Sequence, residues 1–469
     1  MDHFAVTNLT FTYAEDAPPI FQDLTFAPEP GTFNLLTGPS GSGKSTLLKL
    51  LAGLYPQYGG VIQSGQVTVN DTEISTLQPF QRAAHVAMLF QNPSRQFAMR
   101  TVLEQLQFAL ANLQLSPPEI DRRIQTVLTD LHLTQFTHRA LETLSGGEQQ
   151  RVALASVLAL GSSLILLDEP FANVDAAGRT QLLADLKTLQ RTQHKTIILA
   201  DHDLSGYAGL VDQLYHVDGT QRTLLQESPA ALPATTPATP VQGRLLTTGP
   251  LTWHNLSLTV GDRPLITAAQ FTLPASQLGL LSGDNGVGKS TLFAALTRQR
   301  RYAGDIRYQD RPAKQYKLKQ WALQVAEVYQ NSPDQFIRIQ ASDELALSAQ
   351  HSLHPTYWTA ERIAQAAARL NLAAVLDHVS YALSGGQQKK LQVLSMLIMG
   401  QPVLLLDEPF AGLDQASLQA VLTLLQQTVH DLQLSALVVS HQRQGVVSFM
   451  DYELRLADQQ LQLIAGEAA

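Results

Sequence analysis

Gly38-Pro39-Ser40-Gly41-Ser42-Gly43-Lys44-Ser45-Thr46 is the stretch that decides the fold of the first half of the chain. Residues 35–37, just before it, are typical of a buried strand, and the apolar residues of 47–52 recur at helical spacing. In that context the glycines let backbone N–H groups converge on phosphate oxygens, and the helix N-terminus adds its positive end. Lys44 would reach the β- and γ-phosphates of a nucleotide, and Ser45 would bind Mg²⁺. The alternative is an ordinary glycine turn between a strand and a helix.

The same pattern recurs past the middle of the chain as Gly283-Asp284-Asn285-Gly286-Val287-Gly288-Lys289-Ser290-Thr291. A strand pattern over 280–282 precedes it and a helical pattern over 292–296 follows it. The two loop lysines are 245 residues apart, whereas five later pairs are each 239 residues apart: Gln91 and Gln330, Ser145 and Ser384, Asp168 and Asp407, Asp175 and Asp414, and His202 and His441. This constant separation indicates an internal duplication.

Length and composition agree with two domains. The chain has 469 residues, of which 45% are apolar, and this is enough for two α/β cores. We expect domains over residues 1–225 and 249–469, joined by a linker over 226–248. Residues 226–240 hold four prolines and few large apolar side chains. We therefore expect this part of the linker to be an extended spacer that does not pack.

Composition also limits the classes of function. The chain has no cysteine, which excludes disulfides and thiolate metal sites, and its N-terminus does not resemble a signal peptide. Apolar stretches such as 156–167 and 393–406 end before they reach the roughly 20 residues that cross a bilayer. The net charge of −8, without a long basic run, disfavours a nucleic-acid partner. We expect a cytosolic chain that does not itself cross a membrane.

Each half also has a pair of acids that follows four aliphatic residues: Asp168-Glu169 and Asp407-Glu408. A buried parallel strand would deliver such carboxylates to the edge of a sheet. Asp168 and Asp407 would hold Mg²⁺ through water, and the two glutamates would polarise the water that attacks the γ-phosphorus. The alternative is a solvated acidic strand end.

Leu144-Ser145-Gly146-Gly147-Glu148-Gln149 and Leu383-Ser384-Gly385-Gly386-Gln387-Gln388 resemble the signature loop of ABC-type ATPases. Their small residues let a helix N-terminus approach a γ-phosphate closely. The resemblance covers nearly the whole chain outside the linker. It implies two tandem P-loop NTPase domains of the α/β class. Each would have a RecA-like, mainly parallel sheet, an antiparallel β subdomain and a helical signature subdomain.

The resemblance assigns roles to further residues in each half. Gln91 and Gln330 match the family's Q-loop, which senses the metal and the γ-phosphate, and we count them among both the catalytic residues and the metal ligands. Asp175 and Asp414 match the D-loop. His202 and His441 match the catalytic switch histidine.

The family stacks an aromatic side chain on adenine, and the two halves differ at that position. Tyr13 falls there in the first half, whereas alignment of Asn8 with Asn255 places Val260 there in the second. We therefore expect weaker nucleotide binding at the Lys289 site. The residues around the two switch histidines also differ, since Asp201 replaces the usual small hydroxyl residue and Asp203 is matched by Gln442.

In ABC ATPases the signature loop serves the nucleotide that the opposite domain holds. The resemblance therefore implies two composite sites for ATP and Mg²⁺. One would join Lys44, Asp168 and Glu169 to Ser384 and Gly386. The other would join Lys289, Asp407 and Glu408 of the second half to Ser145 and Gly147 of the first half.

Residues 91–97 and 330–336, with Asp-Glu-Pro-Phe-Ala after each catalytic strand, look most like ATPases of energy-coupling-factor (ECF) transporters. Fused forms resemble those of thiamine-precursor systems, and the family takes up vitamins or metal ions. This implies a transmembrane coupling subunit, a substrate-binding membrane subunit and a place on the cytoplasmic face of the membrane. In the family an acidic patch after the Q-loop receives arginines of the coupling helices. Here Glu104 aligns with Asp343 and Gln105 with Glu344, so the second half keeps more acid, although a solvated helix face is equally consistent.

Two alternatives stay open at this stage. A soluble tandem ATPase that acts on ribosomes has a similar layout, but it usually carries a long charged helical linker instead of a short Pro/Ala/Thr spacer. A tandem ATPase of a sugar importer is closer, although its second phosphate loop is typically degraded, and here it is intact.

Overall fold

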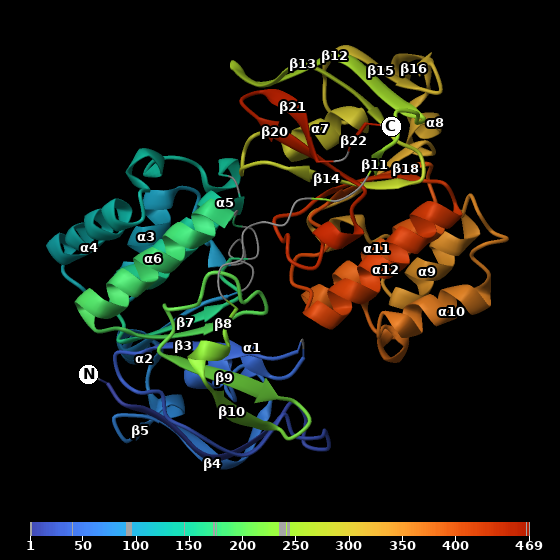
Figure 1. Cartoon of the computed structure of the whole chain (residues 1–469). Helices are drawn as coiled ribbons and strands as arrows, with labels where there is room; N and C mark the ends of the chain where they lie inside the picture. The colour runs from blue at the N-terminus through green and yellow to red at the C-terminus, as the bar shows by residue number, and fades with distance from the viewer. Residues whose placement is uncertain are drawn as a thin grey trace. The chain divides into compact units, whose positions relative to one another are not determined.

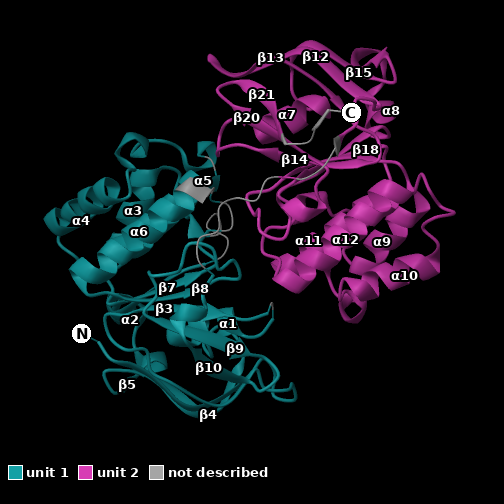
Figure 2. Ribbon diagram, viewed as in Figure 1, with its two compact units in different colours: residues 1–236 teal, residues 237–469 magenta. Residues whose placement is uncertain are grey.

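The computed structural model describes residues 2–39, 41–90, 96–144, 146–171, 174, 176–233, 241, 244–465 and 467–468. The chain divides into two compact units, residues 1–236 and 237–469 (Figure 2). Among the described residues, each unit has a six-stranded, mainly parallel sheet and a four-stranded antiparallel sheet, with helices packed on them (Figure 1). The α/β class expected from the sequence is confirmed.

In the first unit the mainly parallel sheet has the order β10-β9-β3-β8-β7-β6, and the antiparallel sheet has the order β2-β1-β4-β5. The strands are β1 (Phe4–Thr12), β2 (Phe21–Phe26), β3 (Phe33–Thr37), β4 (Val61–Val69), β5 (Thr72–Glu73), β6 (Val86–Leu89), β7 (Leu164–Asp168), β8 (Thr196–Ala200), β9 (Gln213–Asp218) and β10 (Thr223–Glu227). The helices are α1 (Lys44–Leu51), α2 (Pro79–His85), α3 (Val102–Ala111), α4 (Pro117–Asp130), α5 (Gly146–Ala159) and α6 (Ala176–Gln193).

The second unit repeats this plan, with sheets of order β17-β18-β19-β14-β20-β21 and β13-β12-β15-β16. Its strands are β12 (Leu251–Val260), β13 (Arg263–Leu273), β14 (Gln277–Ser282), β15 (Ala303–Tyr308), β16 (Arg311–Pro312), β17 (Val325–Val328), β18 (Val403–Asp407), β19 (Ser435–Val439), β20 (Tyr452–Ala457) and β21 (Gln460–Ala465). Its helices are α7 (Lys289–Leu296), α8 (Leu318–Ala322), α9 (Ala341–Gln350), α10 (Ala360–Arg369), α11 (Gly385–Met399) and α12 (Gln415–Asp431). Two short strands, β11 (Arg244–Leu245) and β22 (Glu467–Ala468), pair in parallel near the chain's end.

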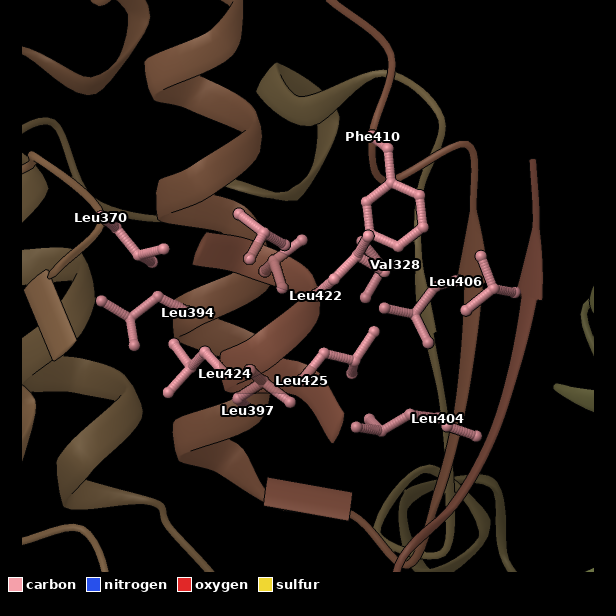
Figure 3. Packing of buried hydrophobic residues seen from close by; sticks show 14 of the residues in the cluster. Val328, Leu370, Leu394, Leu397, Leu404, Leu406, Phe410, Leu422, Leu424 and Leu425 are labelled. Carbon is pink, nitrogen blue, oxygen red and sulfur yellow. The ribbon is translucent and has the colours of Figure 1, made fainter. Parts of the chain in front are cut away.

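The catalytic-strand candidates are aliphatic throughout because both faces of their sheet are covered. On β18, Leu404 and Leu406 pack with helices α11 and α12 (Figure 3), whereas Leu405 belongs to the cluster that contains Trp253 and α7. A strand buried on both faces loses the polar alternation of a half-exposed strand. This packing fixes β18 firmly, and with it the acids at its end.

The segment expected to be a non-packing linker partly packs. Leu232 is only 6% exposed and belongs to the helix-side core of the first unit, while Leu245 lies in a core cluster of the second. Ser228 caps a short 3₁₀ turn, Pro229–Ala231, that brings Leu232 to the core. The expectation that 226–240 does not pack is therefore wrong at Leu232. Residues 234–240, the most proline- and threonine-rich part, lie outside the described residues.

We predict that Leu232→Ala lowers the free energy of unfolding of the first domain by about 2 kcal/mol or more, because it leaves a cavity in a packed core. Leu225→Ala is the matched control, since that leucine is 40% exposed on β10 and its truncation should change stability by less than about 0.5 kcal/mol. Urea unfolding of both variants measures the difference. Equal, small effects would show that the leucine of the linker contributes little.

Candidate active sites

Each glycine loop lies between a parallel strand and a helix, as expected. The loop of the first unit connects β3 to α1 and that of the second connects β14 to α7, and both helices begin at the lysine itself, three residues earlier than the apolar pattern indicated. Gly38 and Gly283 have φ of 135° and 146°, and an added Cβ would lie 2.7 and 2.4 Å from a backbone oxygen of the neighbouring strand. The tight turn therefore needs glycine at these two positions.

The loop lysines fold back over their own loops. Lys44 Nζ donates to the carbonyl oxygens of Gly38 and Pro39 at 2.6 and 2.9 Å. Lys289 Nζ makes the same contacts with Gly283 and Asp284, at 2.6 and 3.0 Å. In both copies the ammonium group is thus held at the centre of the loop, where a phosphate would lie. Ser40 of the first loop lies outside the described residues.

The aspartate at the end of each catalytic strand meets the serine that follows the loop lysine. Ser45 Oγ donates to Asp168 Oδ1 at 2.9 Å, and Asp168 is 5% exposed. Burial and the neighbouring Glu169 raise the pKa of Asp168 to about 6. In the second unit, burial likewise raises the pKa of Asp407, against a hydrogen bond from Ser290.

This hydroxyl–carboxylate pair fits a magnesium site. Mg²⁺ is usually held by one or two carboxylates together with substrate phosphates and water, so a single buried aspartate next to a serine is a suitable donor set. No group of three or more acidic or histidine side chains gathers to hold a metal in the part of the chain that the structure describes. The donors present would hold the ion only together with a bound nucleotide.

The glutamate after each aspartate has an unusual backbone. Glu169 and Glu408 have φ of 46° and 48°, a left-handed conformation that is uncommon for residues other than glycine. Each backbone N–H bonds to the end of the adjacent strand, at Ala200 O (2.9 Å) and Val439 O (3.0 Å). Strain of this kind collects at functional sites when the surrounding structure enforces it.

Both glutamates lie beside the histidine predicted from register. His202 Nδ1 is 3.5 Å from Glu169 Oε1, and His441 Nε2 is 3.4 Å from Glu408 Oε1. Burial lowers the pKa of His202, but the hydrogen bond to Glu169 and the charge of Asp201 outweigh it and raise the pKa to about 9. In the second unit, burial and Asp407 raise the pKa of Glu408 to about 8. The two sites therefore bring together the same residues with different charge balances.

The signature and Q-loops are described mainly in the second unit. Ser384 is exposed and caps α11: its Oγ accepts from Gln387 N at 3.3 Å, while Gln387 Oε1 accepts from Ser384 N at 3.0 Å. Gly386 is buried in the first turn of that helix. Gly147 lies in α5 of the first unit. The remaining predicted residues, Ser145, Gln91 and Asp175, lie outside the described residues.

Lys389 is a site residue that the sequence analysis missed. Its Nζ donates to the backbone oxygens of Tyr329 and Gln330 at 3.4 and 2.5 Å, so the signature helix holds the Q-loop. Burial lowers the pKa of Lys389 to about 8, although the charges of Glu408 and Asp407 oppose this. The sequence did contain a signal for Lys389: the duplicated register places the neutral Gln150 at the same position in the first half, so the two halves differ in charge there.

Tyr13 follows β1 and is half exposed. Its hydroxyl lies 2.6 Å from Thr46 Oγ1, so the ring stands next to the glycine loop. Asn8 and Asn255 both have left-handed backbones, with φ of 46° and 50°. This agrees with the alignment in which Val260 of the second half corresponds to Tyr13 of the first. Val260 is 43% exposed. The first site thus offers an aromatic ring where the second offers a small aliphatic side chain.

The acidic patch expected after the second Q-loop needs correction. Asp343 is exposed, but Glu344 is 4% exposed, and its Oε2 accepts from Ile337 N and Arg338 N at 2.9 and 2.7 Å. Gln105 Oε1 makes the matching bonds in the first unit, to Ala98 N and Met99 N. The residue at this helix position faces the preceding loop and closes it, so it is not a surface acid.

Comparison with known proteins identifies the family. Residues 21–172 and again 266–411 match the family model described as ABC transporter, which is more than half of the chain. The chain belongs to this family. Over 97% of its length it is 32% identical to the putative HMP/thiamine import ATP-binding protein YkoD of Bacillus subtilis, covering 89% of that protein. It is an ATP-hydrolysing enzyme built from two ABC ATPase domains.

Further relatives match one half. The energy-coupling factor transporter ATP-binding protein EcfA1 of Levilactobacillus brevis is 36% identical over 46% of this chain and 75% of that protein. The solved structure of cbiO1 from Clostridium perfringens, described as part of the ABC transporter complex cbiONQ, aligns with a TM-score of 0.44 and 24% identity over 49% of this chain and 90% of that one. None of the described helices of this ABC ATPase is both long and apolar enough to cross a bilayer.

We predict that Glu169→Gln lowers the pKa of His202 by about one to two units, because the substitution removes a negative charge that stabilises the imidazolium. NMR titration of the histidine ring protons measures this, with the His202 signal assigned by its loss in His202→Asn. The exposed His138 provides an internal control, because its titration curve should be the same in the wild-type protein and in Glu169→Gln. A His202 signal that titrates at the same pH in both proteins would contradict the pairing.

Proposed function

We propose that this chain is the ATP-hydrolysing subunit of an ECF-type importer for a vitamin, a vitamin precursor or a metal ion. It would lie on the cytoplasmic face of the membrane and work with a transmembrane coupling subunit and a substrate-binding membrane subunit. The observation that carries the proposal is the similarity over 97% of the chain to a protein named as an HMP/thiamine import ATPase. The similarity of one half to an ECF transporter ATPase supports the same class.

We further propose that the two halves form two composite ATP sites. Each loop lysine, with the acids of its own half, would be completed by the signature serine and glycine of the other half. Support comes from Ser384, which is exposed at the N-terminus of α11 in its own unit, where a second partner could reach it. A helix N-terminus with an exposed serine hydroxyl is suited to a γ-phosphate.

The proposed chemistry uses residues that the structure brings together. Lys44 and the backbone N–H groups of its loop would bind the β- and γ-phosphates. Glu169 would accept a proton from the attacking water, and the charged His202 beside it would stabilise the negative charge that develops on the γ-phosphate. Lys289, Glu408 and His441 would take these roles at the second site.

Mg²⁺ fits the proposed sites through Ser45 with Asp168 and through Ser290 with Asp407. Gln91 and Gln330 would complete its surroundings. When bound, the ion would neutralise charge on the β- and γ-phosphates. We propose ATP and Mg²⁺ as the cofactors.

We expect Glu169→Gln and Glu408→Gln each to slow turnover at its own site about 100-fold, because each removes the carboxylate that polarises water. The double variant should therefore lose nearly all steady-state ATPase activity, measured by phosphate release. Glu227→Gln, at an exposed glutamate on β10, is the matched control. Normal activity in the double variant would refute the assigned roles.

The surface next to the second Q-loop suits a membrane partner. Hydrogen bonds join the loop after Gln335 to residues 379–381: Ser380 N donates to Ile339 O at 2.7 Å, and the Tyr381 hydroxyl donates to Phe336 O at 2.9 Å. Four exposed apolar side chains gather on these two segments: Ile337 (74% exposed), Ile339 (68%), Val379 (42%) and Tyr381 (48%). We call them the apolar patch. Exposed apolar side chains that cluster in this way mark interaction sites.

The first half lacks this surface. By the 239-residue register its corresponding residues are small or charged: Ala98, Arg100, Ala140 and Glu142. The two halves therefore present different surfaces next to their Q-loops. We propose that the apolar patch receives the apolar face of a cytoplasmic helix of the transmembrane subunit. Asp343, exposed on the neighbouring α9, would pair with a basic residue of that helix.

We expect the double substitution Ile337→Ser and Ile339→Ser to reduce recovery of the membrane subunits that co-purify with the wild-type chain at least about tenfold, since it removes apolar contact area from the proposed interface. Leu318→Ser is the matched control, because Leu318 is 65% exposed on α8 and does not belong to the patch. Thermal melting checks that the variants fold. Unchanged recovery would argue against docking at the patch.

A further inference from the structure

One buried arginine holds the segment that carries the first switch histidine. Arg179, in the first turn of α6, donates from Nη1 to Asp203 Oδ2 at 2.8 Å and from Nη2 to Asp201 Oδ2 at 3.1 Å. Nη2 also donates to the backbone oxygen of Asp203 at 2.5 Å. Its guanidinium also lies over the rings of Phe171 and Tyr207, 5.2 and 5.3 Å from their centroids. Arg179 thus contacts residues on both sides of the histidine.

Asp201 passes this restraint on to His202. Its Oδ1 accepts from the backbone N–H groups of His202 and Asp203 at 2.7 and 3.0 Å. Its Oδ2 accepts from the Tyr207 hydroxyl at 2.7 Å as well as from Arg179. The Asp201 side chain is 4% exposed, so its charge depends on these partners. Together they fix the turn that places His202 3.5 Å from Glu169.

The second half has none of these four polar groups at the matching positions. The 239-residue register replaces Arg179, Asp201, Asp203 and Tyr207 by Leu418, Ser440, Gln442 and Val446. There the turn is closed by a neutral bond from Gln442 N to Ser440 Oγ at 3.2 Å. The nearby Arg443 instead pairs with Glu453 on β20. His441 is held directly, by Glu408 Oε2, which accepts from its backbone N–H at 3.4 Å.

We propose that Arg179 is a positioning residue for hydrolysis at the first site only: through Asp201 it fixes His202 beside Glu169. The inference rests on the proposed role of Glu169 in polarising water. Arg179 lies on α6, so its bonds to Asp201 and Asp203 attach the switch segment to this helix. The second site holds its switch without an arginine at this position, which Leu418 occupies. The two sites therefore respond differently to loss of the arginine.

The test uses the full chain with Glu408→Gln, so that turnover reports the first site. Arg179→Leu introduces the residue of the second half and should lower kcat at least about tenfold, with KM for ATP changed less than about twofold. Arg179→Lys should keep part of the activity. A fourfold variant, with Arg179→Leu, Asp201→Ser, Asp203→Gln and Tyr207→Val, copies the neutral switch and should recover kcat to within about threefold of its parent.

The matched control is Lys187→Met on the same helix. Lys187 is 8% exposed in its side chain, similar to the 12% of Arg179, and pairs with Asp212 at 2.9 Å, so its loss removes an ion pair of a similarly buried cation that does not touch the switch. It should leave kcat within about twofold. If Arg179→Leu and Lys187→Met lowered kcat and melting temperature alike, Arg179 would be merely structural and the inference would be overturned.

The outcomes separate this inference from the function on which it rests. If Arg179→Leu kept normal kcat while Glu169→Gln in the same background was inactive, the inference would fail and the proposed function would stand. If Glu169→Gln was itself active, the assigned role of Glu169 would fail and the inference with it. A fall in kcat at constant KM, reversed by the fourfold variant, would support the positioning role.

Discussion

The constraint on which both domains depend is that two adjacent carboxylates must be held at the buried end of one strand. β7 and β18 each lead into an aspartate and a glutamate, and burial together with the neighbouring acid raises the pKa of Asp168 in the first half and of Glu408 in the second. The surroundings offset this with positive and hydrogen-bonding groups: a serine hydroxyl on the aspartate, a histidine beside the glutamate and the loop lysine nearby. The fold therefore prepares a site whose unfavourable charge a nucleotide-bound cation can relieve.

The two halves meet this constraint with cations in different places. In the first half, Arg179 supports the switch segment from α6, and the signature helix carries the neutral Gln150. In the second half, Lys389 lies in the signature helix near Asp407 and Glu408, and Leu418 takes the place of the arginine. The cation of the first half therefore lies at the switch segment, whereas the cation of the second half lies near the acids themselves. The two sites carry the same motifs, but their charge distributions differ.

The sequence predicts much of this because its strongest signals are local. A glycine loop between a strand and a helix, or four aliphatic residues before two acids, defines both an element and its place in a sheet. The constant register and the family resemblance then single out His202 and His441, and the structure places each within 3.5 Å of the glutamate of its own half. These assignments needed no knowledge of long-range packing.

What the sequence could not show depends on contacts between distant segments. The sequence places Leu232 in a proline-rich spacer, but in the structure its side chain packs into the core of the first unit. Glu344 reads as a surface acid, yet its helix position turns it toward the loop that it closes. Lys389 and Arg179 belong to no motif that the sequence analysis recognised. Only the structure shows that the Lys389 ammonium group contacts a Q-loop carbonyl and that the Arg179 guanidinium contacts the switch segment.

Fusion of the halves makes such divergence possible. In a homodimer every substitution appears at both sites, so an arginine that suits one switch must suit the other. In a duplicated chain, Arg179 with Asp201 and Leu418 with Ser440 can coexist, because each pair changes in its own copy. The same freedom applies to the surface, where Ile337 and Ile339 are exposed in one half and Ala98 and Arg100 take their places in the other. A partner that is itself asymmetric, with two different cytoplasmic segments, would select for this divergence, since each half then always meets the same segment.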